Sequence, residues 1–142
     1  MLKLDEVRIA MDRGTLDADL RLGPGRRVAV LGPSGAGKST LLDVIAGFYA
    51  PMAGRVGWDG RDLTGVGPER RPVSILFQDG NLFPHLDLAR NLGLALHPDG
   101  RKPGPEDMAR IEGALRRVGL DGMARRRPGT LSGGQQSRAA LA

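Results

Sequence analysis

A glycine-rich segment that ends in lysine and serine has the residue types needed to hold phosphate groups. It is Gly32-Pro33-Ser34-Gly35-Ala36-Gly37-Lys38-Ser39, which fits the spacing G-x-x-x-x-G-K-[ST]. Glycines let backbone N–H groups curl around phosphate oxygens, while Lys38 supplies a positive charge and Ser39 a hydroxyl for Mg²⁺. A chance glycine turn is the alternative, but an apolar run precedes the segment and a helical pattern follows it. The sequence therefore predicts a P-loop for a nucleoside triphosphate.

A second glycine-containing segment, Leu131-Ser132-Gly133-Gly134-Gln135, also precedes a helical pattern. Serine and two glycines at a helix N-terminus form an anion site by the same physics as the P-loop. Taken alone, the segment is better explained as a capped helix start with Ser132 as the N-cap. A single domain rarely needs two cradles for a γ-phosphate, however. The two segments together therefore favour nucleotides that are shared across a dimer interface.

The elements that must position the P-loop are indicated by the patterns on either side of it. Residues 28–31 form a continuous apolar run, which predicts a strand buried on both faces. Residues 38–46 predict a helix that Gly47 caps at its C-terminus. Its expected apolar face consists of Leu41, Leu42, Ile45 and Ala46.

Other strands are expected on both sides of this unit. An imperfect strand over 2–9 and an alternating strand over 16–22, joined by turn residues at 12–14, predict a hairpin. Residues 55–58 predict a short strand. Residues 73–77 predict another buried strand, started by Pro72.

The pattern becomes helical from Pro84 onward. Leucines recur at i+4 spacing between residues 88 and 96, and a Gly- and Pro-rich linker over 97–105 follows. Residues 108–118 predict an amphipathic helix with acidic residues at its start and arginines at its end, as the helix dipole favours. The segment 133–142 starts like a helix and stops without a cap, so we expect a C-terminal truncation.

Composition excludes several classes of function. The chain has no cysteine, which rules out disulfides, thiol catalysis and cysteine metal sites. No apolar leader is visible at the N-terminus, and the longest apolar stretch, 41–53, is too short to span a bilayer. A membrane function would need another chain to do the spanning. The net charge is +5, but the arginines are scattered and aromatic residues are scarce, so no nucleic-acid partner is expected.

Three motifs together resemble the ATP-binding subunits of ABC transporters. Gly32 to Thr40, Phe77-Gln78 and Leu131 to Gln135 are similar to that family's Walker A loop, Q-loop and signature motif, in the same order. The resemblance implies an α/β fold: a P-loop nucleoside triphosphatase core with an N-terminal antiparallel β part and a helical insert. Residues 1–142 would be an incomplete ABC ATP-binding domain. Residues 1–83 and the signature region would form its nucleotide-binding core, and residues from about 84 to 128 the insert.

Within the family, the chain most resembles the ATP-binding subunit of bacterial importers of thiamine or thiamine diphosphate. The stretches that carry this similarity are Val30 to Phe48, Arg70 to Gln78, Asn81 to Phe83 and His85-Leu86. The resemblance implies that binding and hydrolysis of ATP drive thiamine import. An importer for another small solute, a nucleotide binder without hydrolysis, and a non-transport member acting in repair or translation stay as alternatives.

The resemblance also implies a role for each matched residue. The cofactors would be ATP and Mg²⁺. Gln78 would contact the metal and the attacking water, Ser39 would bind the metal, and the Q-loop would sense the membrane subunit. The expected ATP contacts are Gly32, Pro33, Ser34, Gly35, Ala36, Gly37, Lys38, Ser39 and Thr40, with Ser132, Gly133, Gly134 and Gln135 from a second copy.

The expected partners follow from the same resemblance. They are a second copy in a head-to-tail dimer, integral membrane permease subunits and, indirectly, a periplasmic solute-binding protein. The chain would lie peripherally at the cytoplasmic face of the bacterial inner membrane.

The sequence departs from the family pattern in three places. The Walker B Asp-Glu pair and the switch histidine, which follow the signature in the family, lie outside this sequence, so we expect no hydrolysis by these residues alone. Met11 occupies the region of an aromatic residue that stacks on adenine, which predicts a weaker thioether contact. Ser137 replaces a glutamine ahead of Arg138.

Overall fold

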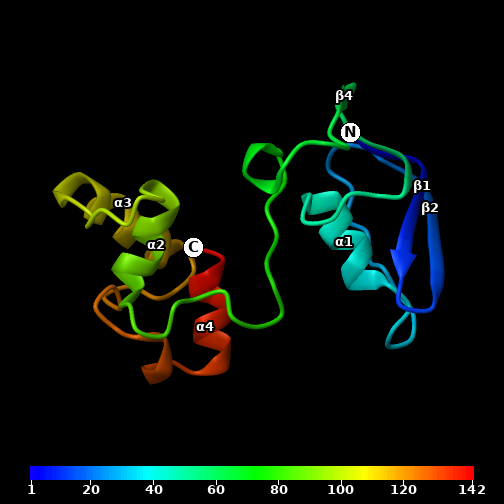
Figure 1. Ribbon diagram of the computed structural model, residues 1–142. Coiled ribbons are helices and arrows are strands. Elements are labelled where there is room, and N and C mark those ends of the chain that lie inside the picture. The colour runs from blue at the N-terminus through cyan, green and yellow to red at the C-terminus, as the bar shows by residue number, and fades with distance from the viewer. The chain divides into compact units, whose positions relative to one another are not determined.

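The computed structural model describes residues 1–142, which divide into two compact units, Met1–Ile75 and Leu76–Ala142 (Figure 1). The N-terminal unit holds the strands and one helix, and the C-terminal unit holds the other helices. The strands are β1 (Leu2–Met11), β2 (Gly14–Leu22), β3 (Ala53–Trp58) and β4 (Arg61–Asp62). The helices are α1 (Lys38–Ala46), α2 (Leu88–Leu96), α3 (Pro105–Arg117) and α4 (Gly133–Ala140), with short 3-10 turns at Pro68–Arg70 and Pro128–Thr130.

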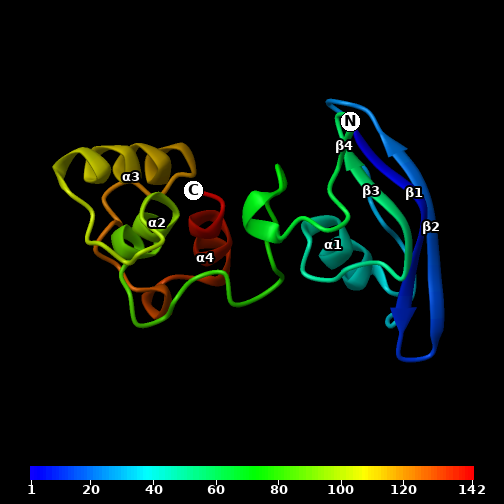
Figure 2. The same cartoon turned by 45° about the horizontal axis from the view of Figure 1, so that its top comes forward.

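The N-terminal unit is an antiparallel sheet with α1 against one face (Figure 2). The strand order is β2-β1-β3-β4, and β1 pairs with β2 from Leu2↔Leu22 to Met11↔Gly14, which confirms the predicted hairpin. Alternate residues of β1 pack with Leu41 and Val44 of α1 in one apolar core. The helix that begins at the predicted P-loop is therefore anchored to the hairpin.

One irregularity in β1 brings two backbones unusually close together. The register of β1 shifts between Leu4 and Val7 against β2, and Glu6 there adopts a positive φ of 48°. Opposite this bulge, Gly54 of β3 has φ 83°, and a Cβ on it would collide with the carbonyl oxygen of Glu6. Glycine is the residue that both the positive φ and the close approach require.

The C-terminal unit is a small helical cluster around Leu88, Leu115 and Leu120, all almost fully buried. Its loops are braced by the buried Asn91 of α2. The Asn91 amide accepts from the Phe83 N–H at 2.7 Å and donates to the carbonyls of Phe83 and Leu86 at 3.1 Å. These bonds satisfy the loop backbone that precedes α2, so its path depends on one side chain.

The start of α3 is fixed by a carboxylate. Asp107 accepts a hydrogen bond from the Gly104 N–H at 3.0 Å and lies 2.9 Å from Nε2 of His97. The bond from Gly104, and next that from His97, lower the pKa of Asp107 below its ordinary value. A carboxyl group with a lowered folded-state pKa stabilises the fold above its unfolded pKa, and this stabilisation is lost as the pH falls through the folded-state pKa.

We therefore expect Asp107→Asn to lower the melting temperature of the C-terminal unit at neutral pH, because the uncharged amide is a weaker acceptor. The difference from the parent should begin to shrink below the unfolded pKa of about 4 and vanish as the pH falls through the lowered folded-state pKa, where the parent carboxylate becomes protonated. Far-ultraviolet circular dichroism melts across the acid range measure this. Glu106→Gln is the control, since Glu106 shares the first turn of α3 without capping Gly104. An equal loss in both variants would mean that the helix dipole alone is responsible.

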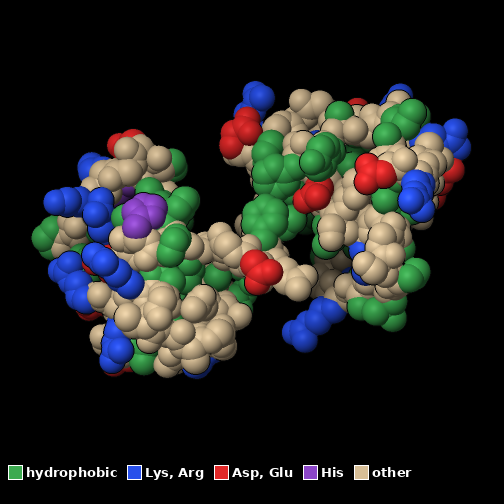
Figure 3. Space-filling model, turned by 60° about the horizontal axis from the view of Figure 1, so that its bottom comes forward, with side chains coloured by type: hydrophobic (Ala, Val, Ile, Leu, Met, Phe, Trp, Pro, Cys, Tyr) green, Lys and Arg blue, Asp and Glu red, His purple; other side chains and the backbone are tan.

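Two predicted strands are wrong. Residues 28–31 and 73–77 form no strand, and the sheet contains only the four antiparallel strands. Leu31 is 89% exposed, and Leu76 and Phe77 are each 47% exposed. Apolar side chains are accordingly visible on the surface of both units (Figure 3). An apolar run forms a buried strand only where neighbouring strands supply partners for its N–H and C=O groups, and neither run belongs to the sheet.

The helix predictions are confirmed, with shifted ends in the C-terminal unit. Helix α1 covers 38–46 as predicted, and Gly47 caps it with φ 95°. Its buried face differs, because Val44 is buried whereas Leu42 is 46% exposed. Helix α3 begins at Pro105, earlier than the apolar spacing indicated, since proline suits the first turn of a helix. None of the helices combines the length and apolar character that a membrane crossing requires.

Candidate functional site

The glycine-rich loop ends at a helix whose first N–H groups have no side-chain cap. Gly35 and Gly37 adopt φ of 80° and 83°, and the Ala36 N–H donates to the Pro33 carbonyl at 3.3 Å. Helix α1 then begins at Lys38, with Gly37 as its N-cap and no acidic residue in its first turn. The N-terminus of α1 thus combines unsatisfied N–H groups with the positive end of the helix dipole, and both favour an anion there.

The Lys38 side chain folds back over the loop that precedes it. Its ammonium group donates to the carbonyl oxygens of Gly32 at 2.9 Å and Pro33 at 2.7 Å. The positive charge therefore lies at the loop, where a phosphate group would bind. Ser39 is exposed in the first turn of α1, so its hydroxyl is accessible to a cation there. No group of three or more His, Cys, Asp or Glu side chains could hold a metal ion.

A pocket of about 420 Å³ lies between this loop and the tip of the hairpin. Gly35 and Ala36 line one side, and Met11, Asp12, Arg13, Thr15 and Leu16 line the other. A Cβ on Gly37 would lie 2.8 Å from Cε of Met11, so the Met11 thioether is close against the loop. At the hairpin side, the pocket is thus lined by a thioether rather than by an aromatic ring.

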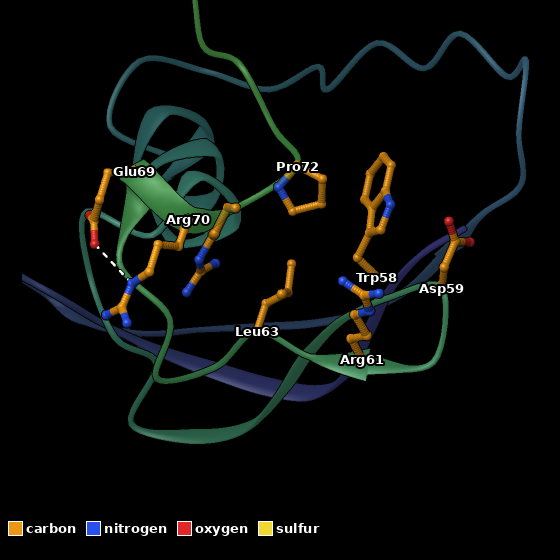
Figure 4. Close-up of a pocket in the computed structure, with 8 residues that line it drawn as sticks. Trp58, Asp59, Arg61, Leu63, Glu69, Arg70 and Pro72 are labelled. Carbon is orange, nitrogen blue, oxygen red and sulfur yellow. Dashed lines mark hydrogen bonds and ion pairs between the residues drawn. The ribbon is translucent and has the colours of Figure 1, made fainter. Parts of the chain in front are cut away.

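A larger pocket of about 530 Å³ lies elsewhere in the N-terminal unit (Figure 4). Trp58, Leu63 and Pro72 give it an apolar lining, with charged side chains of Arg61 and Glu69 beside them. It contains no residue of the predicted P-loop. Volume alone would therefore not select the pocket beside the loop.

Gln78 is exposed, in a loop of the C-terminal unit. The side-chain amide of Asn81 closes this loop. Asn81 accepts from the Phe77 N–H at 2.7 Å and donates to the Phe77 carbonyl at 2.6 Å. Gly80 adopts φ 76° within the turn. Asn81 therefore sets the path of the chain around Gln78. In the sequence, Asn81 stands out only as part of the stretch Asn81 to Phe83 that carries the family resemblance.

The signature segment forms the capped helix start that the sequence predicted. The Ser132 hydroxyl accepts from the Gln135 N–H at 3.3 Å, and the Gln135 side chain accepts from the Ser132 N–H at 2.9 Å, a reciprocal capping box. Ser137 bonds back to the Gly133 carbonyl at 3.1 Å. Gln78 and this segment belong to the C-terminal unit, whereas all P-loop residues belong to the N-terminal unit.

The glycines at the start of α4 are not required by packing within the chain. A Cβ on Gly133 or Gly134 would meet no atom within 4 Å, and neither residue has a positive φ. Both residues are exposed. Side chains are thus absent from a helix N-terminus that faces open space, which leaves room for a molecule outside the chain to approach the backbone closely.

Residues 16–142 match the protein family described as ABC transporter. The chain belongs to this family. Membership implies nucleotide binding. The α/β fold class is confirmed as well, in the form of a partial ABC ATPase domain.

Several curated relatives match over the full length of the chain. The thiamine import ATP-binding protein ThiQ of Cereibacter sphaeroides is 58% identical over 100% of the chain and 61% of that protein. ThiQ of Escherichia coli K12 is 47% identical, again over 100% of the chain and 61% of the relative. The chain thus spans about three fifths of the length of these relatives.

Solved structures agree with the family assignment. The ATP-binding cassette MJ0796, solved as a dimer bound to ADP and phosphate after hydrolysis, is 31% identical with a TM-score of 0.79, covering 99% of this chain and 67% of that one. The cassette MJ1267 gives a TM-score of 0.86 at 24% identity, with 99% of this chain and 62% of that one covered. The second similarity supports the fold alone.

Proposed function

We propose that this chain is the ATP-binding part of a subunit that couples ATP binding and hydrolysis to thiamine import. The observation that carries the proposal is the 58% identity with a thiamine import ATP-binding protein across all 142 residues. An intact P-loop geometry with Lys38 at the loop supports it. The solute is inferred from the relatives, because the ATP-binding subunit of such an importer does not hold the solute itself.

At the nucleotide, residues Gly32 to Thr40 would hold the ATP phosphates. Lys38 would exchange its two carbonyl partners for phosphate oxygens, and N–H groups of the first turn of α1 would bind the same oxygens. Ser39 would bind Mg²⁺, and Gln78 would contact the metal and the water. Mg²⁺ would neutralise charge on the β- and γ-phosphates during phosphoryl transfer.

Partners are part of the same proposal. The unobstructed glycines at α4 suit a second copy that brings its nucleotide to Ser132, Gly133, Gly134 and Gln135 in a head-to-tail dimer. Permease subunits would carry thiamine across the bacterial inner membrane, supplied by a periplasmic solute-binding protein. The chain would lie at the cytoplasmic face, with residues 1–83 and the signature region in the nucleotide-binding core and residues from about 84 to 128 as the insert.

The decisive experiment is uptake of radiolabelled thiamine by native cells that lack the gene, with the gene supplied on a plasmid as the comparison. Loss of uptake that the plasmid restores is the expected result. If thiamine uptake stayed normal and the uptake of another solute were lost, thiamine would be the wrong substrate, but the importer function would stand.

In parallel, calorimetric titration of the purified chain with MgATP tests nucleotide binding, and titration with ATP in a chelator should show weaker binding.

A further inference from the structure

Arg71 is the one charged side chain that is buried, with 7% of its surface exposed. No carboxylate pairs with it. Its guanidinium instead donates to backbone carbonyls: Nη1 to Val44 at 2.8 Å and Ile45 at 2.9 Å, and Nε to Val66 at 2.7 Å. Burial lowers the pKa of Arg71, but arginine stays protonated in proteins. Desolvation of this cation is therefore offset by carbonyl oxygens alone.

Two of these carbonyls belong to the C-terminal end of α1, where the last carbonyls of a helix lack partners and the dipole is negative. The N–H groups of Gly47 and Phe48 both donate to the backbone carbonyl oxygen of Asp43. The carbonyl oxygens of Val44 and Ile45 are thus left to accept from Arg71. Helix α1 has no basic residue in its last turn. Arg71 supplies the missing cation from a distant point of the chain.

Gly47 makes room for this contact. A Cβ on Gly47 would lie 2.5 Å from Nε of Arg71, so a larger residue would displace the guanidinium. Glycine at this position thus serves both the left-handed helix end and the placement of Arg71.

The opposite end of the same helix is the phosphate loop. Helix α1 has nine residues, and a helix this short is only marginally stable without tertiary support. Its N-terminus has no side-chain cap. A guanidinium at one end and a phosphate at the other favour the same helix dipole, so holding the C-terminus also holds the N–H groups and Lys38 at the N-terminus in place.

We propose that Arg71 is a positioning residue for phosphate binding, acting through α1 without touching the nucleotide. The inference rests on the proposed function, since it concerns phosphates bound at residues 32–39. Removal of the guanidinium should loosen α1 and weaken MgATP binding together. A residue that merely stabilised the sheet would lower the melting temperature and leave the affinity of the folded protein unchanged.

The test is calorimetric titration of the purified chain with MgATP, well below the melting temperature of each variant. Arg71→Met should raise Kd about tenfold, and Arg71→Lys by a smaller factor, because lysine keeps the cation but loses the planar fork of donors. Leu2→Ala is the control, since it removes a buried β1 side chain of the same core. Its melting temperature should fall while its Kd stays within about twofold of the parent.

A second measurement does not depend on nucleotide. Without ATP, amide hydrogen exchange over residues 41–48 should be faster in Arg71→Met than in Leu2→Ala, relative to the β1 amides of each. Unchanged exchange in α1, or faster exchange with an unchanged Kd, would overturn the positioning role. If the unsubstituted chain binds no MgATP, the proposed function fails and the positioning role fails with it. If only the Arg71 variants bind MgATP weakly, the result supports both the proposed function and the positioning role.

Discussion

Replacement of Lys38 by alanine is expected to abolish tight binding of MgATP, with Kd raised by about two orders of magnitude. The Lys38 ammonium lies at the loop, bonded to the carbonyls of Gly32 and Pro33 at 2.9 and 2.7 Å. With nucleotide bound, these partners would give way to phosphate oxygens. Each charge-assisted hydrogen bond contributes about 1.5–3 kcal/mol, so the loss of two of them accounts for the expected factor.

Isothermal titration calorimetry of the purified variant measures this affinity directly. Lys102→Ala is a matched control, because it removes an exposed lysine from the linker before α3, outside the predicted site. Circular dichroism should show that both variants are folded. An unchanged nucleotide affinity in Lys38→Ala would refute the P-loop assignment.

The substitution with the largest expected effect on stability is Gly54→Ala. Alanine at φ 83° costs about 1–2 kcal/mol, and its Cβ would meet the Glu6 carbonyl oxygen and lie 2.5 Å from that of Asp5. Because these are backbone atoms of the central strand β1, the clash is relieved only by moving the sheet. We expect a total loss of about 3 kcal/mol and a drop in melting temperature of roughly 15 °C.

Trp58 provides the measurement, since it is the only tryptophan and lies at the end of β3. Its fluorescence reports unfolding of the N-terminal unit separately from the helical unit. Gly57→Ala is the control from the same strand, because a Cβ there would make only an ordinary contact of 3.5 Å with the Arg61 carbonyl. If Gly54→Ala melted no earlier than Gly57→Ala, the close approach at the β1 bulge would be disproved.

The start of α1 after the glycine-rich loop could be predicted from the sequence because its signals are local, and phosphate binding by that loop stays a prediction. The spacing of Gly32, Gly37, Lys38 and Ser39 specifies a loop followed by a helix start, and α1 begins at Lys38 as expected. The hairpin was predictable for a similar reason: alternation marks each strand, and adjacent turn residues join them. Ser132 as an N-cap needs only its own backbone and the next turn.

The runs 28–31 and 73–77 show where local signals fail. Their composition is that of buried strands, yet a strand depends on partners that lie far away in the sequence. The strands of the sheet lie within residues 2–22 and 53–62, and neither run pairs with them. The roles assigned to Gln78 and the signature residues stay predictions for a different reason, since they depend on a nucleotide and a second copy.

By itself, then, the sequence determined the glycine-rich loop before α1, the hairpin and the helices, because bonds within a few residues and the conformations of glycine and proline specify them. The tertiary structure alone decided that Arg71 is buried against the end of α1, that Gly54 meets Glu6, and that Met11 lies against the loop. In each of these contacts the partners come from separate segments. No spacing or composition encodes such contacts, since they exist only once the chain has folded and brought the segments together.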